Sequence, residues 1–527
     1  MSGLSRRALL QTTALAGAAV AVSGGSAGAS SDLIRIGPAD PRYDSLRVGY
    51  NRRFDVRPEQ IIRPRSAEEV ARVVESAVSS GKRVGIYGGG HCFEDFVFSP
   101  DHPVIVHMGS MTDVGFDARR GVYSVGGGAR LLNVYERLWG DHGVTVPGGV
   151  CYSVGAGGHV TGGGFGLLSR LHGLTVDHLA GVEVVTVDAR GRANVEYVTR
   201  QDTGARGDLF WAHTGGGGGN FGVVTRFDFR SPDERRYPRG LVEPPATVTL
   251  VSPQWSWDGV DAARFSAFIT EFSLWCKENF ASGGPSDAVF PWLIARHRGL
   301  GGLGVVLQIA SGSRESEAVA RKLVRRLAVA LGQDDSGVPW TEMPWLNAVK
   351  TIGTGSVENT DPNMRGKQGS ANFRGVPRAE QLEAMYTALT TDIPGSASAG
   401  IDISAMGGAI GAVPPDATAV YSRQATMRFL IQTFWRDKAF DQPNIDWLRR
   451  SYRSIFASTG GVPIFDDVTS GSYVNYPNAD LSSPEWNTSG LPAGDLYYGG
   501  NYGRLRQVKS AWDPRGFFAH RQSVEGK

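Results

Sequence analysis

Dense glycine clusters constrain the fold of this chain more than any other feature of its sequence. The chain has 71 glycines in 527 residues, and they are densest at positions 88–90, 148–166 and 215–219. Glycine accepts positive φ angles and lets the backbone approach a ligand closely, and successive N–H groups in such runs can form a concave site for a pyrophosphate. One cluster alone most often marks tight turns. Three clusters in one stretch, two of which hold His91 or Cys151 as a nucleophile, favour a dinucleotide-binding domain.

The segment around these clusters alternates short β-branched runs with amphipathic helices. Residues 67–80 place four apolar side chains on one helical face, and residues 131–139 predict a second helix. Strands are expected at residues 82–87, 104–107, 123–126, 182–188 and 193–198. The glycines do not have the GxGxxG spacing of a nicotinamide-binding βαβ unit. We therefore expect residues 56–232 to form an α+β domain that binds a different dinucleotide.

A proline-rich segment at residues 231–245 marks a domain boundary. Beyond it, strands at 303–309 and 427–435 and helices at 262–280 and 313–331 predict a second domain over residues 240–460, with its own sheet. Residues 461–527 have the composition of loops, with one short helix expected at 505–511. Loops this long in a compact protein are commonly functional.

The N-terminus has the pattern of a twin-arginine export signal. Ser5-Arg6-Arg7 precedes an apolar run that ends near Val22, and Ala27-Gly28-Ala29 forms a small-residue cleavage site. The apolar run is too short to span a bilayer, so no stable membrane anchor is expected. We predict that residues 1–30 are a removable signal, that the export machinery is a transient partner, and that the protein is secreted.

Composition argues against several other classes of function. The net charge is only +2 and no basic block is interleaved with aromatic residues, so nucleic-acid binding has no support. No group of residues has metal-ligand spacing, and no serine lies in a nucleophile elbow. The three cysteines leave at least one thiol unpaired. Cys92 and Cys276 are expected to be buried thiols, and a disulfide between them stays open as an alternative.

Taken together, these motifs resemble the vanillyl-alcohol-oxidase/PCMH superfamily and, within it, the berberine bridge enzyme-like branch. The resemblance covers nearly all of the mature chain. Its matching segments are Gly89-Gly90-His91, Gly149-x-Cys151-x-x-Val154-Gly155-x-Gly157-Gly158-His159, Gly162-Gly163-Gly164-Phe165-Gly166, Asp177-His178-Leu179, Asp208-Leu209-Phe210-Trp211-Ala212, Asn220-Phe221-Gly222-Val223-Val224, Tyr497-Tyr498-Gly499-Gly500-Asn501-Tyr502 and Gln522-Ser523-Val524. The resemblance implies an α+β fold with a PCMH-type FAD-binding domain and a substrate domain whose large antiparallel sheet is flanked by helices. Tyr87 and Thr214 stand where the family often has arginines, so backbone N–H groups are expected to bind more of the pyrophosphate.

The resemblance also implies that FAD is the cofactor and that two covalent bonds hold it. In bicovalent members of the family, the histidine at the position of His91 attaches to the 8α-methyl group of the flavin, and the cysteine at the position of Cys151 attaches to ring carbon C6. Outside these motifs, the two residues would be interpreted as a core histidine and a buried thiol. Further FAD contacts are expected from Gly88, Gly89, Gly90, Cys92, Gly149, Val154, Gly155, Gly157, Gly158, His159, Gly163, Gly164, Gly166, Gly222, Val223, Val224, Tyr498 and Asn501.

The same resemblance points to Tyr476 as the catalytic base. Residues 473–477 read Tyr-Val-Asn-Tyr-Pro, which is similar to the Y-x-N-Y pattern in which the second tyrosine is the base of alcohol and sugar oxidases, with Tyr473 as its partner. A tyrosine, with its usual pKa of about 10, needs a nearby cation or donated hydrogen bonds to ionise near neutral pH. A spacing of three does not place both side chains on one face of a regular strand, so a bulge or turn is implied. The alternative is that both tyrosines are core residues.

The implied reaction is oxidation of an alcohol to a carbonyl by hydride transfer to flavin N5, with O2 reduced to H2O2. Residues 91–96 and 487–490 are especially similar to actinobacterial antibiotic-tailoring oxidases, which implies a small-molecule substrate such as a polyketide or a glycosylated antibiotic. A secreted oligosaccharide oxidase is the alternative enzyme. Two alternatives come from other classes: a colourless, non-catalytic binding protein, and a dehydrogenase that requires added NAD.

Overall fold

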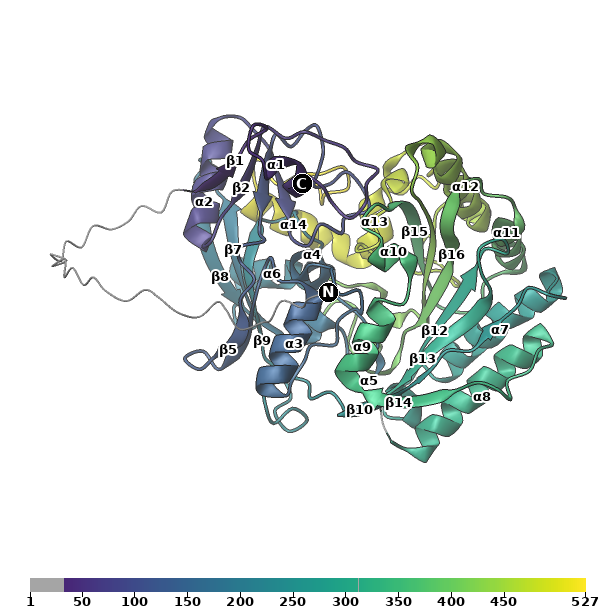
Figure 1. The fold of residues 1–527 in the computed structure, drawn as a ribbon. Coiled ribbons are helices and arrows are strands. Elements are labelled where there is room, and N and C mark those ends of the chain that lie inside the picture. The colour runs from purple at the N-terminus through teal and green to yellow at the C-terminus, as the bar shows by residue number, and fades with distance from the viewer. Residues whose placement is uncertain (1–32, 311) are drawn as a thin grey trace, which may run out of the picture. The chain divides into compact units, whose positions relative to one another are not determined.

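Three β-sheets organise the part of the chain that this computed structural model describes, residues 33–310 and 312–527 (Figure 1). Residues 34–527 form one compact unit. The predicted export signal at residues 1–30 lies outside the described residues. Among the helices that are described, none is long and apolar enough to cross a bilayer.

The first sheet has four strands in the order β1 (Ile34–Ile36), β2 (Gln60–Arg63), β4 (Val104–His107) and β3 (Val84–Tyr87). The last three are parallel, and β1 pairs antiparallel with β2. Helix α2 (Ala67–Ser79) connects β2 to β3 and confirms the helix predicted from the apolar spacing. The Ser66 hydroxyl caps its N-terminus by accepting a hydrogen bond from the Glu69 N–H. Because β3 ends at Tyr87, the first glycine cluster begins at the carboxyl end of that strand.

The second sheet is antiparallel and has five strands in the order β5 (Val114–Asp117), β6 (Val122–Gly126), β9 (Val223–Phe229), β7 (Leu179–Val187) and β8 (Ala193–Thr199). The predicted hairpin is formed by β7 and β8. Helix α3 (Leu131–His142) extends beyond its predicted end and stops at Gly143, whose φ is +68°. The second and third glycine clusters lie next to three short helices, α4 (Ala156–Thr161), α5 (Ser169–His172) and α6 (Gly204–Ala212).

The third sheet is the large antiparallel sheet that the resemblance implied. Its main path runs β14 (Trp340–Pro344), β10 (Thr247–Val251), β13 (Leu303–Ile309), β12 (Val289–Arg296), β16 (Ser396–Ala405), β17 (Met427–Trp435) and β15 (Arg365–Phe373), and β11 (Gln254–Trp255) pairs with β13. Four helices cover one of its faces, α7 (Ala262–Glu278), α8 (Arg314–Leu331), α11 (Ala379–Thr390) and α12 (Asp441–Ile455) (Figure 1). The opposite face is free of these helices and is available for a ligand.

The remaining helices are short or lie near the C-terminus. They are α1 (Tyr43–Leu46), α9 (Trp345–Gly353), α10 (Val357–Thr360), α13 (Ala493–Tyr498) and α14 (Tyr502–Trp512), with 3₁₀ turns at Thr175–His178, Pro285–Ala288, Gly408–Ile410, Ser422–Gln424, Lys438–Phe440, Ala457–Thr459, Ala479–Ser482 and Gly499–Asn501. The predicted helix at 505–511 is the centre of α14, which packs against α6. The C-terminal segment therefore returns to the part of the chain that carries the glycine clusters.

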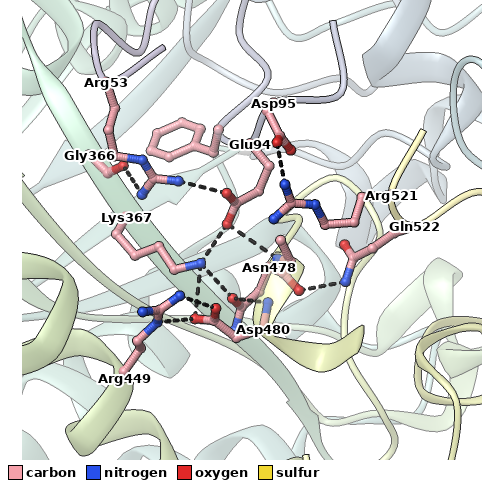
Figure 2. A network of polar contacts seen from close by, with 12 residues as sticks. Arg53, Glu94, Asp95, Gly366, Lys367, Arg449, Asn478, Asp480, Arg521 and Gln522 are labelled. Carbon is pink, nitrogen blue, oxygen red and sulfur yellow. Dashed lines mark hydrogen bonds and ion pairs between the residues drawn. The ribbon is translucent and has the colours of Figure 1, made fainter. Parts of the chain in front are cut away.

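A buried network of ion pairs joins the N-terminal part of the chain, strand β15, helix α12 and the C-terminal segment (Figure 2). The Glu94 carboxylate, close to the first glycine cluster, accepts hydrogen bonds from Lys367 Nζ at 2.6 Å and from Arg53 Nη2 at 2.7 Å. Lys367 on β15 also pairs with Asp480 of the C-terminal segment at 3.1 Å, and Asp480 pairs with Arg449 on α12 at 2.8 Å. Burial alone would raise the pKa of Glu94, but Lys367 and Arg53 hold it below its usual value. Strand β15, at the edge of the large sheet, is thus joined to the segment that carries Glu94 and to the C-terminal segment that carries Asp480.

Candidate functional site

A cavity of about 820 Å³ lies between the glycine clusters and the open face of the large sheet. Every second residue of β17 from Arg428 to Phe434 lines it, as the period of a strand requires. Most of the predicted site residues also line it: Gly88, Gly89, Gly90, His91, Cys92, Gly149, Cys151, Val154, Gly155, Gly157, Gly158, His159, Gly166, Gly222, Val224, Tyr473 and Tyr476. A cavity of this size is within the usual range of cofactor sites.

The other predicted contacts lie behind the cavity wall. They are Gly163, Gly164, Val223, Tyr498 and Asn501. The Tyr498 hydroxyl donates a hydrogen bond to the Gly216 carbonyl at 2.8 Å, and Asn501 Nδ2 donates to the carbonyl of Pro415 at 2.8 Å. These two side chains support the third glycine cluster and its surroundings from the protein side.

The first two glycine clusters touch each other through their backbones. A Cβ atom on Gly89 would lie 2.1 Å from the Gly155 nitrogen, so no larger residue fits there. By contrast, a Cβ on Gly158 would meet nothing within 4 Å, because that position opens into the cavity. The glycines therefore bring two backbone segments together and leave room beside them for a bulky ligand.

His91 and Cys151 converge on one serine. His91 Nε2 lies 2.7 Å from Ser153 Oγ, and Cys151 Sγ lies 4.0 Å from the same oxygen. The Tyr50 ring stacks on the His91 ring with centroids 4.2 Å apart, and the Cys151 thiol donates to Asn359 Oδ1 at 3.4 Å. The two side chains that sequence reasoning proposed as tethers are thus held within one hydrogen-bonded group, although 60 positions separate them in the chain.

Burial keeps both of these side chains uncharged. It lowers the pKa of His91 to about 3, with the positive charge of Arg130 acting in the same direction. Burial also raises the pKa of Cys151, against a smaller opposing effect of the hydrogen bond from Ser153. A neutral imidazole carries one nitrogen lone pair, so His91 can act as a nucleophile at neutral pH.

The two predicted catalytic tyrosines lie on a turn rather than on a strand. The Tyr476 N–H donates to the Tyr473 carbonyl at 3.0 Å, which brings both rings to the cavity with centroids 5.1 Å apart. The Tyr473 hydroxyl accepts a hydrogen bond from Asn475 Nδ2 at 3.1 Å. Within the described chain no group bonds the Tyr476 hydroxyl, which faces the cavity. The turn explains how both tyrosine side chains reach the cavity although they are three positions apart, a spacing that would place them on opposite faces of a regular strand.

Arg428 supplies the cation that sequence reasoning could not name. Its guanidinium carbon lies 3.6 Å from the centre of the Tyr473 ring and 4.4 Å from that of Phe165. Arg428 Nε donates to Asn372 Oδ1 at 3.1 Å, whereas Nη1 is buried without a partner among the described residues. Burial raises the pKa of Tyr476, and Arg428 opposes that rise. This cation stabilises any negative charge that forms on the tyrosine pair.

A cluster of charged and polar side chains in the cavity wall was not predicted from the sequence. Arg296 pairs with Asp402 at 3.4 Å and with Glu358 at 3.3 Å, and Gln432 Nε2 donates to the second oxygen of Asp402 at 2.5 Å. Burial raises the pKa of Asp402 to about 6, although Arg296 acts to lower it. All four side chains line the cavity and can bind hydroxyl groups of a ligand. The available sequence signal was the presence of charged residues inside otherwise apolar strands.

His159 has a structural contact in addition to its place in the cavity wall. Its Nε2 accepts a hydrogen bond from the Gly149 N–H at 3.1 Å, and its carbonyl accepts one from Asn475 Nδ2 at 3.0 Å. Burial lowers its pKa to about 4, so the ring is neutral. His159 therefore joins the cysteine-bearing turn to the tyrosine-bearing turn. Among the described residues, no group of three or more His, Cys, Asp or Glu side chains could hold a metal ion.

Comparison with protein families gives two matches. A family described as an FAD binding domain matches residues 58–193, and one described as berberine and berberine like matches residues 472–525. The first range contains both glycine segments with the tether candidates, and the second contains the tyrosine turn. The matched regions thus supply the tether candidates and the tyrosine turn, whereas Arg296, Glu358, Asp402 and Arg428 lie between them in the sequence.

Relatives match along almost the whole chain. The aclacinomycin-N/aclacinomycin-A oxidase of Streptomyces galilaeus is 38% identical and covers 97% of this chain and 95% of its own length. The hexose oxidase of Chondrus crispus is 31% identical, over 93% of this chain and 94% of its own length. A glycopeptide hexose oxidase solved with teicoplanin has a TM-score of 0.88 at 36% identity, covering 94% of this chain and 99% of that one. A flavoenzyme of caerulomycin biosynthesis has a TM-score of 0.89 at 40% identity, with the same coverage. The chain therefore belongs to the berberine bridge enzyme-like family of FAD-linked oxidases.

Proposed function

We propose that this protein is a bicovalent FAD oxidase that converts an alcohol on a secondary metabolite, a polyketide or a glycosylated antibiotic, to a carbonyl and reduces O2 to H2O2. The observation that carries the proposal is that His91, Cys151 and Tyr476 line a single cavity. Bound FAD would accept the hydride from the substrate carbon. The side chains then have to hold the cofactor, orient the substrate and take its hydroxyl proton.

Two tethers and a glycine-lined wall fit a flavin dinucleotide. His91 and Cys151 share the Ser153 contact, so two attachment points lie close together at one place in the wall. The backbone at Gly158 leaves open space where a side chain would otherwise project. Covalent attachment at two points would retain the cofactor while the substrate side of the cavity stays open.

Tyr476 is the proposed base. Its hydroxyl faces the cavity without a protein partner in the described chain, so it is available to a substrate hydroxyl. Arg428 lowers the cost of the phenolate, and the hydrogen bond from Asn475 to Tyr473 favours negative charge on the neighbouring ring. Tyr473 is proposed as the partner that passes this stabilisation to Tyr476.

The proposed substrate class is supported by the relatives and by the charged side chains in the cavity wall. The named relatives include an aclacinomycin oxidase, and one related structure holds teicoplanin. Asp402, Glu358 and Arg296 provide acceptors and donors for hydroxyl groups. A hexose oxidase is also among the relatives, so the second candidate is a carbohydrate oxidase of the same fold. Measuring H2O2 release with a polyketide alcohol or a glycosylated antibiotic, compared with cellobiose, distinguishes the two.

We also propose that residues 1–30 direct export through the twin-arginine pathway and that the mature protein is secreted. Sequencing the N-terminus of protein recovered from the culture medium tests this. A start near residue 31 supports the proposal, and retention of an uncleaved chain in the cells contradicts it.

The decisive experiment on the cofactor is the intact mass of the acid-denatured protein. An FAD-sized addition should survive denaturation in the wild type and in Cys151→Ala, and it should be lost when His91 and Cys151 are both replaced. Cys276→Ala is the matched control and should keep the addition, because Cys276 is buried in helix α7 and does not line the cavity. Free flavin in the denatured wild-type protein would refute the covalent attachment.

A further inference from the structure

Among the residues that the structure describes, Ser153 is the one side chain within hydrogen-bonding distance of both proposed tethers. Its hydroxyl lies 2.7 Å from His91 Nε2 and 4.0 Å from Cys151 Sγ. Both tether residues line the cavity, whereas Ser153 lies behind them and does not. Ser153 is therefore placed to act on the tethers and not on a bound ligand directly.

The hydrogen bonds around Ser153 have one consistent direction. The Cys151 thiol donates to Asn359 Oδ1 at 3.4 Å, so the sulfur lone pairs are left to accept the Ser153 O–H. The Nε2-protonated tautomer of His91 gives every proton of this group an acceptor among the described residues, because Nδ1 has no partner there. In that tautomer the Ser153 oxygen accepts a hydrogen bond from His91 Nε2–H and the Ser153 proton points to the sulfur. Because burial keeps His91 neutral, the second ring nitrogen, Nδ1, then carries the lone pair.

We propose that Ser153 is the positioning residue for covalent attachment of FAD. It fixes the His91 tautomer in which Nδ1 is the nucleophile, and its O–H stabilises the thiolate of Cys151. Within the described chain, Nδ1 has no hydrogen-bond partner, so nothing competes with bond formation there. The proposal rests on the bicovalent attachment proposed above.

The chemistry of attachment explains why the tautomer matters. The tether at His91 replaces one C–H bond of the flavin methyl group by a C–N bond; the methyl proton and the Nε2 proton of His91 leave, and the two electrons of the C–H bond pass to the flavin and then, with two protons, to O2, giving H2O2. The tether at Cys151 likewise replaces a ring C–H bond by a C–S bond, with loss of the thiol and ring protons and transfer of two electrons to O2. A nitrogen that carries a proton cannot form the first bond, and a thiol is a poorer nucleophile than a thiolate in the second.

The test measures attachment rates separately at each tether. Apoprotein of the full mature chain is mixed with FAD in air, and samples are denatured, digested and quantified by mass spectrometry for the peptides that carry His91 and Cys151. Ser153→Ala should slow attachment about tenfold at His91 in a Cys151→Ala background, the factor expected from one ordinary hydrogen bond. It should also slow attachment at Cys151 in a His91→Ala background. Ser153→Thr, which keeps the hydroxyl, should restore both rates to within about twofold.

Two controls separate positioning from folding and from cofactor binding. Ser252→Ala removes a hydroxyl from the same cavity wall without touching either tether and should leave both rates unchanged. Ser153→Ala should bind FAD before attachment with the wild-type dissociation constant, measured by quenching of flavin fluorescence. Wild-type rates in Ser153→Ala, or a loss of non-covalent FAD binding, would overturn the role of Ser153. Absence of attachment in the wild type would instead refute the proposed bicovalent cofactor.

Discussion

The guanidinium of Arg428 lies 3.6 Å from the centre of the Tyr473 ring, which in turn packs at a right angle against the Tyr476 ring, 5.1 Å away. A cation that faces one aromatic ring of such a pair stabilises negative charge on either hydroxyl. Arg428 is fully buried and keeps one nitrogen without a partner among the described residues. A buried cation of the large sheet therefore lies directly against the tyrosine turn.

Replacing Arg428 by methionine should raise the pKa of Tyr476, because the substitution removes the positive charge that opposes the effect of burial. In the proposed mechanism the rate of flavin reduction depends on the Tyr476 phenolate, so the rise of this rate with pH should move to higher pH by about one unit or more. Stopped-flow measurement of flavin reduction across pH detects the shift. Arg428→Lys keeps the charge and should shift the profile less. An unchanged profile in Arg428→Met would show that this cation does not act on the base.

Tyr476→Phe should slow flavin reduction by about 10²–10⁴-fold, the usual contribution of a positioned base. The flavin should stay attached, because among the described residues Tyr476 forms no hydrogen bond with either tether residue. Anaerobic reduction by substrate, together with the intact mass, measures both effects. Tyr473→Phe is the comparison: it keeps the ring that faces Arg428 and should slow flavin reduction less than Tyr476→Phe does. Near-wild-type reduction in Tyr476→Phe would move the base elsewhere.

Local sequence patterns predicted the parts of the site that lie within short motifs. The glycine segments with His91 and Cys151, and the tyrosine pair, could be named because these short motifs resemble those of the berberine bridge enzyme-like family. The helix at 67–80 followed from apolar periodicity, which burial against a sheet preserves, and the strands at 303–309 and 427–435 were also predicted from the sequence. These features depend on neighbours that are close along the chain.

The charged side chains of the cavity wall, such as Asp402 and Arg428, could not be predicted in the same way. Asp402 lies directly opposite Leu430 in the pairing of β16 with β17, so its neighbours are fixed by strand order and register. Arg428 lies within a strand that is buried along its whole length, and the sequence predicted the strand without a role for this side chain. A guanidinium at such a position requires a compensating partner. That requirement was the one signal in the sequence that could have pointed to it.

Glu94→Gln should destabilise the protein through the buried network in Figure 2. The substitution leaves Lys367 and Arg53 without their shared carboxylate in a buried place, which costs about 3–5 kcal/mol. Urea unfolding followed by circular dichroism, on samples with equal flavin content, measures the loss. Arg449→Gln is the matched control at the more exposed end of the network and should cost about 1 kcal/mol or less. Equal losses in the two variants would show that the network acts as a surface cluster.

Asp402→Asn should shift the pH profile of flavin reduction in the opposite direction to Arg428→Met. The negative charge of Asp402 raises the pKa of Tyr476, so removing that charge should lower it and move the profile to lower pH by about one unit. Because the pKa of Asp402 is about 6, the wild-type carboxylate is charged above that pH and protonated below it. The variant should therefore react faster than the wild type above about pH 6, and the two rates should converge near pH 5.

Convergence of the two rates near pH 5 would distinguish an electrostatic effect of Asp402 from a loss of packing in the variant, because a damaged cavity would slow flavin reduction at every pH. Ser404→Ala is the control, because Ser404 lies two residues further along β16 on the same cavity wall and carries no charge. Its profile should coincide with that of the wild type. A constant ratio between Asp402→Asn and the wild type from pH 5 to pH 9 would mean that Asp402 binds substrate without acting on the base.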